Sequence, residues 1–89
     1  AQYYEADALW EGIKVGDGLT LAREPNNAHD ANAVRVEWRG HKLGYLPRAE
    51  NRAVADEMDH GGRVEARIAR LLPHRNPWRR VLIEVFVGL

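Results

Sequence analysis

The sequence contains no cysteine among its 89 residues. A disulfide framework and a thiolate zinc site are therefore excluded, and the compartment is left open, with the cytoplasm favoured. The sequence also has no apolar run near the roughly 20 residues of a membrane-spanning helix, so no membrane span is expected. The chain begins at Ala1 rather than methionine, which fits a domain taken from a longer protein or the mature part of a processed one.

The sequence also lacks a net charge, because 13 lysines and arginines balance 13 aspartates and glutamates. This balance argues against a general affinity for polyanions. The charges are nevertheless unevenly distributed. From Gly61 onward six arginines face only two glutamates, which gives that segment a net charge of +4. Arginine suits bidentate phosphate contacts, although a GC-rich genome produces the same bias.

Apolar and polar residues alternate over several short segments, as in strands with one buried face. A longer segment, Pro47 to Asp59, contains no helix breaker and is followed by Gly61, so we predict a helix with a left-handed glycine cap. The predicted strands are Tyr3-Tyr4 and residues 18–24, 33–38, 41–46, 64–72 and 80–87, with a helical turn or irregular structure at 6–14 and a loop at 73–79.

The connections between these strands set the expected fold. Apart from the helix they are too short for parallel crossovers, so the sheet should be mainly antiparallel. Six short strands in so small a chain must protect their edges, which favours a curled sheet or a small barrel. We therefore expect a single domain over residues 1–89: a mainly β, six-stranded, mostly antiparallel barrel with one or two short helices. Trp10 and Trp38 are expected in its core.

The polar loop between the strands at 18–24 and 33–38 is rich in asparagine and aspartate. These side chains accept hydrogen bonds from nearby backbone N–H groups and tolerate left-handed backbone. A loop of about eight residues exceeds what a tight hairpin needs, and loops of this kind often carry function. From the residues alone, Asn32 is best explained as a cap of this turn, whereas Asp30 is either a cap or a ligand contact.

The sequence carries no catalytic or metal-binding motif. His29-Asp30 is the only adjacent acid/base pair in a loop, and H-x-x-x-H, the P-loop and the nucleophile elbow are all missing. His41, His60 and His74 lack the spacing of metal ligands. We therefore predict a protein that is not an enzyme and has no metal or cofactor.

Two segments together carry a family resemblance. Residues 23–36 read REPNNxxDxNAVxV, and after Gly40 residues 43–48 read LGYLPR before the predicted helix. This combination resembles the HIRAN domain family, in its bacterial form, and the resemblance covers essentially the whole chain. It implies a six-stranded barrel related to the oligonucleotide-binding fold. In eukaryotes the family's domains lie at the front of fork-remodelling ATPases such as helicase-like transcription factor, where they bind single-stranded DNA and capture its free 3′ end.

The resemblance also implies a DNA-end pocket. Asp30 would accept a hydrogen bond from a terminal 3′-hydroxyl, where an internal nucleotide would place a phosphate. Arg48 would contact phosphate, and aromatic faces would stack on bases. Gln2 stands where an arginine is common, and His29 where a tyrosine is common. The implied nucleic-acid-binding residues are Tyr3, Asn27, His29, Asp30, Tyr45, Arg48 and Trp78.

The function expected from this resemblance is non-catalytic binding of single-stranded DNA at its 3′-hydroxyl end, in a DNA-repair or replication-fork protein. The expected partners are single-stranded DNA and other domains of a longer parent, with a monomer favoured. Tyr3 and Tyr45 can instead be residues of the barrel wall. The alternative function is a protein–protein interaction module, whose binding would lack the steep salt dependence of phosphate contacts.

Overall fold

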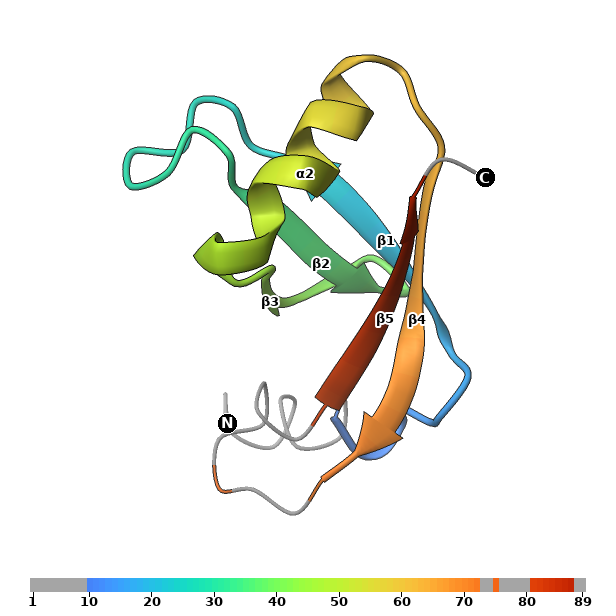
Figure 1. Ribbon diagram of the computed structural model, residues 1–89. Coiled ribbons are helices and arrows are strands. Elements are labelled where there is room, and N and C mark those ends of the chain that lie inside the picture. The colour runs from blue at the N-terminus through green and yellow to red at the C-terminus, as the bar shows by residue number, and fades with distance from the viewer. Residues whose placement is uncertain (1–9, 73–74, 76–80, 88–89) are drawn as a thin grey trace.

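Figure 1 shows the computed structural model of the chain, which describes residues 10–72, 75 and 81–87. Five strands form one antiparallel sheet in the order β3-β2-β1-β4-β5. Each strand and the helix begin and end within one residue of the positions predicted from the sequence. The elements are β1 (Gly18–Arg23), β2 (Val34–Trp38), β3 (His41–Tyr45), α2 (Arg48–Asp59), β4 (Val64–Leu71) and β5 (Val81–Val87).

The alternation seen in the sequence places one face of the sheet in the core. On β2, Val34, Val36 and Trp38 are buried while the residues between them are partly exposed. Most of the buried apolar side chains in the described residues form two clusters, one beneath α2 and one around Trp38. Trp38 is a core residue, as expected, and its indole N–H donates to the carboxylate of Asp17 at 3.0 Å. Trp10 is only half-buried, and it packs against the cluster around Trp38.

Among the residues that the structure describes, the sheet is not closed into a barrel, which corrects the prediction from the sequence. Within the described residues, β3 and β5 are the two edges of the sheet. In this part of the chain the two edges do not pair with each other, and an open pocket of about 700 Å³ lies between β5 and the connection after β3. Irregularities in the β2–β3 and β4–β5 pairings contribute to the curl of the sheet without closing it. The sixth predicted strand, at Tyr3-Tyr4, lies outside the described residues and stays a prediction.

Helix α2 lies across one face of the sheet (Figure 1). Pro47 precedes its first turn, and Gly61, at a φ of 77°, is the predicted left-handed cap at its other end. The buried residues of the helix are Asn51, Val54 and Ala55. Among the residues that the structure describes, no helix is both long and apolar enough to cross a membrane.

The polar loop between β1 and β2, residues 24–33, lies beside the helix (Figure 1). Arg23, at the end of β1, holds it there. Its guanidinium donates to the carbonyls of Ala33 at 2.7 Å and Ala31 at 2.9 Å, and also to both carboxylate oxygens of Asp59, at 2.9 and 3.2 Å. One side chain therefore connects the loop to the last residue of α2.

The backbone conformation of the turn between β2 and β3 can be tested by a substitution at Gly40. Arg39 and Gly40 both have a positive φ, of 48° and 82°, as a two-residue turn of this hand requires. We expect Gly40→Ala to lower the free energy of unfolding by about 1–2 kcal/mol, because a Cβ disfavours this backbone. Gly18→Ala is the control, since an added Cβ has no neighbour within 4 Å at either position and only Gly40 has a positive φ. Equal stabilities of the two variants in urea denaturation would contradict the prediction.

The connection between Arg23 and Asp59 predicts a dependence of stability on pH. The hydrogen bond from Arg23 holds the pKa of Asp59 below its ordinary value. Because the pKa is lower in the folded chain, the ionised carboxylate favours folding above the unfolded value of about 4. This contribution is lost as the pH falls through the folded pKa. We expect Asp59→Asn to be less stable than the natural chain at pH 7, with a difference that shrinks toward pH 2.

Urea denaturation at several pH values measures this difference. Asp56→Asn is the control, because Asp56 is an exposed carboxylate on the same helix whose side chain accepts no hydrogen bond from the described residues. A gap between Asp59→Asn and the natural chain that stays constant from pH 7 to pH 2 would show that the ionised carboxylate does not act in this way.

Candidate nucleic-acid interface

A pocket of about 210 Å³ lies where the loop 24–33, the end of β3 and the start of α2 meet. All five predicted site residues that the structure describes line it, whereas Tyr3 and Trp78 lie outside the described residues. The pocket therefore brings together side chains from three separate elements. Its lining residues are Asn27, His29, Asp30, Ala33, Tyr45, Leu46, Arg48 and Asn51.

Asn27 gives the loop its shape. Its Oδ1 accepts hydrogen bonds from the backbone N–H groups of His29 at 2.8 Å and Asp30 at 3.2 Å, which is the Asx turn expected of such a residue. Its Nδ2 donates to Glu24 Oε1 at 3.0 Å. With both ends of the amide engaged, Asn27 acts on the pocket chiefly by fixing the backbone that presents His29 and Asp30.

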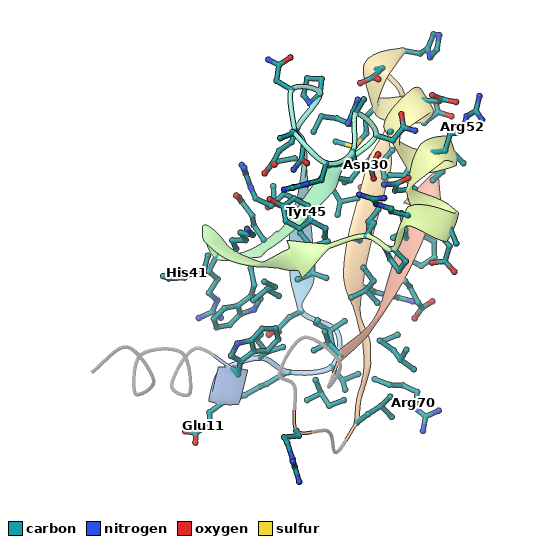
Figure 2. The ribbon with its side chains drawn as sticks, turned by 90° about the vertical axis from the view of Figure 1, so that its left-hand side faces the viewer. Glu11, Asp30, His41, Tyr45, Arg52 and Arg70 are labelled. Atoms are coloured by element: carbon teal, nitrogen blue, oxygen red, sulfur yellow. The ribbon has the colours of Figure 1, made fainter. Side chains whose placement is uncertain are left out.

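Asp30 lies at the junction of the loop and the helix (Figure 2). Its Oδ1 accepts the backbone N–H of Asn32 at 2.9 Å, and its Oδ2 accepts Asn51 Nδ2 at 2.8 Å. These two hydrogen bonds, the one from Asn32 first, hold the pKa of Asp30 below its ordinary value, so the side chain is ionised at neutral pH. A carboxylate has about four acceptor positions, so capping the turn leaves Asp30 able to accept a further hydrogen bond.

Arg48 begins α2 at the rim of the pocket. Its side chain is 72% exposed, its Nη2 donates to the carbonyl of His29 at 2.7 Å, and its Nε lies 3.8 Å from Asp30 Oδ2. A cation is unfavourable at a helix N-terminus, and here the Asp30 carboxylate offsets the effect. Since a guanidinium has five N–H donors, most of those of Arg48 remain available to an anion.

Tyr45 is a half-buried residue of the pocket wall. Its hydroxyl donates to the Glu24 carboxylate at 3.1 and 3.2 Å, and Lys42 Nζ lies 4.6 Å from the centre of its ring. Glu24 also accepts from Asn27 and Arg35, and these donors, Asn27 first, lower the pKa of Glu24. Tyr45 is therefore held in place at its hydroxyl end.

Two of the residues that shape the site were absent from the sequence-based site. Asn51 is 2% exposed and is the one buried polar residue in the part of the chain that the structure describes. The sequence does indicate that Asn51 is buried, because helical spacing places it on the same face as Val54, Ala55 and Met58. Glu24, which accepts hydrogen bonds from Asn27 and Tyr45, belongs to the segment at 23–36 that carries the family resemblance, although no site role was predicted for it.

A metal centre is not formed by the residues described. Within ranges 10–72 and 81–87 and at residue 75, no three histidine or carboxylate side chains gather where they could hold a metal ion. The acidic side chain that lines the pocket is Asp30, which is 20% exposed, and the guanidinium that lines it is that of Arg48, which is 72% exposed. The arrangement suits hydrogen bonding to a ligand that has a hydroxyl group and a nearby anion.

Comparison with solved structures identifies the fold. The crystal structure of a protein from Lactobacillus plantarum matches with a TM-score of 0.77 and 28% identity, covering 98% of this chain and 84% of the other. The crystal structure of the HIRAN domain of human HLTF matches with a TM-score of 0.65 and 23% identity, over 82% of this chain and 57% of the other. At that identity the second likeness concerns the fold alone.

Comparison of sequences identifies the family. A protein of Oryza sativa subsp. japonica named Fanconi-associated nuclease 1 homolog is 37% identical over 51 residues, which are 53% of this chain and 5% of that protein. This chain thus corresponds to a small part of that relative. The family model for the HIRAN domain matches residues 1–89. The chain therefore belongs to the HIRAN domain family.

Proposed function

We propose that this HIRAN domain, over residues 1–89, is a non-catalytic module that binds single-stranded DNA at its 3′-hydroxyl end. We base the proposal on the pocket of about 210 Å³, because side chains from the loop 24–33, β3 and α2 converge on it. Pockets for drug-sized ligands measure about 300–1,000 Å³. This smaller pocket suits a single sugar or base, as the end of a strand would offer.

The charges around the pocket favour an end over an internal nucleotide. The ionised Asp30 accepts hydrogen bonds and repels a phosphate, so a terminal 3′-hydroxyl suits it whereas a 3′-phosphodiester does not. Arg48, exposed at the rim, can bind the phosphate on the other side of the terminal sugar. Asp30 and Arg48 then select opposite ends of one nucleotide.

The aromatic side chains of the site have different roles in this proposal, as a pocket wall or as stacking surfaces for bases. Tyr45 is held by Glu24 and covered by Lys42, so it contributes a wall of the pocket. The exposed His29 is the described residue best placed to stack on a base, where each stack is worth about 1–3 kcal/mol. Tyr3 and Trp78 stay proposed as further stacking residues.

Family membership fits a nucleic-acid-binding module. The relative from Oryza sativa bears the name of a nuclease, an enzyme that acts on nucleic acid. This chain matches only 5% of that protein, so we propose a nucleic-acid partner and a repair or replication-fork setting without its nuclease activity. Attachment to other domains of a longer parent, the monomeric state and the bacterial type of the domain stay predictions.

The end preference can be tested with two labelled oligonucleotides that differ only in a 3′-hydroxyl or a 3′-phosphate. In fluorescence anisotropy we expect the hydroxyl form to bind at least tenfold more tightly, since each factor of ten corresponds to about 1.4 kcal/mol. Asp30→Asn should bring the ratio of the hydroxyl affinity to the phosphate affinity closer to one, because it removes the charge that repels the 3′-phosphate. Asp56→Asn, which makes the same change on the exposed side of α2, should leave the ratio unaltered.

The other outcomes of this experiment separate the alternatives. Equal binding of both oligonucleotides by the natural chain would leave a single-strand binder without end selection. An absence of binding to either one at low salt would overturn the nucleic-acid function and favour the protein–protein interaction module.

The phosphate contact can be tested through the salt dependence of the same binding. We expect Arg48→Gln to weaken binding and to reduce the slope of log affinity against log salt by about 1, as loss of one phosphate contact does. Arg52→Gln is the matched control, because Arg52 is an exposed residue of the same helix that projects away from Asp30 (Figure 2). The same reduction in slope for both variants would mean that Arg48 acts only through the net charge.

A further inference from the structure

Asn51 has an unusual environment for an amide side chain. It is 2% exposed, it belongs to the first turn of α2, and it lines the 210 Å³ pocket. Its Nδ2 donates to Asp30 Oδ2 at 2.8 Å. Since an ionised carboxylate can only accept, this contact fixes which end of the amide faces Asp30. The carbonyl oxygen, Oδ1, must therefore point elsewhere.

Asn51 Oδ1 accepts no hydrogen bond from the residues that the structure describes. In that same part of the chain, no polar side-chain atom is both sealed from solvent and without a partner. The oxygen therefore keeps a small solvent-accessible area, although the residue as a whole is almost completely buried. Asn51 lines the pocket. A ligand bound in the pocket can therefore donate a hydrogen bond to Asn51 Oδ1.

The pocket thus offers two acceptors, the Asp30 carboxylate and the Asn51 carbonyl oxygen, which belong to directly hydrogen-bonded side chains. A strand that ends in deoxyribose has a single hydroxyl donor on its terminal sugar. A strand that ends in ribose has two, on neighbouring carbon atoms. The 2′-hydroxyl is also the group by which proteins distinguish RNA from DNA at a given position.

We propose that Asn51 is a specificity-determining residue whose Oδ1 accepts the 2′-hydroxyl of a terminal ribose while Asp30 accepts the 3′-hydroxyl. The pocket then binds the vicinal diol of an RNA 3′ end more tightly than the single hydroxyl of a DNA end. This inference rests on the proposed end-binding function and extends it to a second class of ligand. Ala33 and Leu46 supply the apolar lining beside these acceptors.

The proposal is tested with three labelled oligonucleotides of one deoxyribonucleotide sequence that differ only in the last sugar, which is deoxyribose, ribose or 2′-O-methylribose. All three keep the 3′-hydroxyl. We expect the ribose end to bind about fivefold more tightly than the deoxyribose end, as one added hydrogen bond of about 1 kcal/mol provides. The 2′-O-methyl end should bind no better than deoxyribose, because a methyl ether cannot donate.

Asn51→Ala separates contact with the ligand from support of Asp30. If Asn51 contacts the 2′-hydroxyl, the variant should reduce the ratio of ribose to deoxyribose affinity to about one. If Asn51 only positions Asp30, both ends should weaken equally and the ratio should persist. Arg52→Gln, at an exposed position of the same helix, should keep the ratio of the natural chain.

Each result bears on a different claim. Equal affinities of the natural chain for the ribose and deoxyribose ends would overturn the role of Asn51 and leave the DNA-end function intact. A ribose preference that persists in Asn51→Ala, or that 2′-O-methylribose shares, would also overturn it. Failure of all three oligonucleotides to bind at low salt would instead overturn the proposed function itself.

Discussion

The candidate site depends on the way the polar loop 24–33 is fastened to helix α2. Arg23 joins two loop carbonyls to Asp59 at the end of the helix, and Asp30 joins the loop to Asn51 in its first turn. Arg48, at the start of the helix, donates to the loop as well. These contacts join residues that lie between 8 and 36 positions apart in the sequence, so they fix the position of the loop against the helix. The pocket exists because these three contacts span the length of one helix.

The arrangement also explains how the candidate site keeps an acidic side chain. Asp30 is kept ionised by donors from the loop backbone and from the helix, and it stays partly accessible between them. In the proposed function it selects a hydroxyl over a phosphate, and the exposed Arg48 beside it attracts the phosphate of the same nucleotide. Behind the pocket, Glu24 holds the Asn27 side chain and the Tyr45 hydroxyl at once. The wall and the loop are thus coupled through a residue that does not line the pocket.

The sequence was a good guide to local structure and a poorer one to closure of the sheet. Alternation, the glycines at 40 and 61 and the proline at 47 located the elements to within one residue, because each of these signals acts over a few neighbouring residues. Closure into a barrel depends on whether two strands distant in sequence meet. Here the edges β3 and β5 do not pair in the described part of the chain, and an open pocket lies between β5 and the connection after β3. The alternation of apolar and polar residues within a strand does not indicate whether that strand pairs with one distant in the sequence.

By itself the sequence determined the strands, the helix, the polar loop and the membership of a family, since these follow from residue order and short-range spacing. Only the tertiary structure decided that five of the candidate residues share one pocket and that Asn51 and Glu24 support it. Asn51 contacts Asp30, and Tyr45 contacts Glu24, each across 21 positions of the chain. Contacts at that separation form only when the sheet and the helix pack together, and so the pocket's acceptors are a property of the fold.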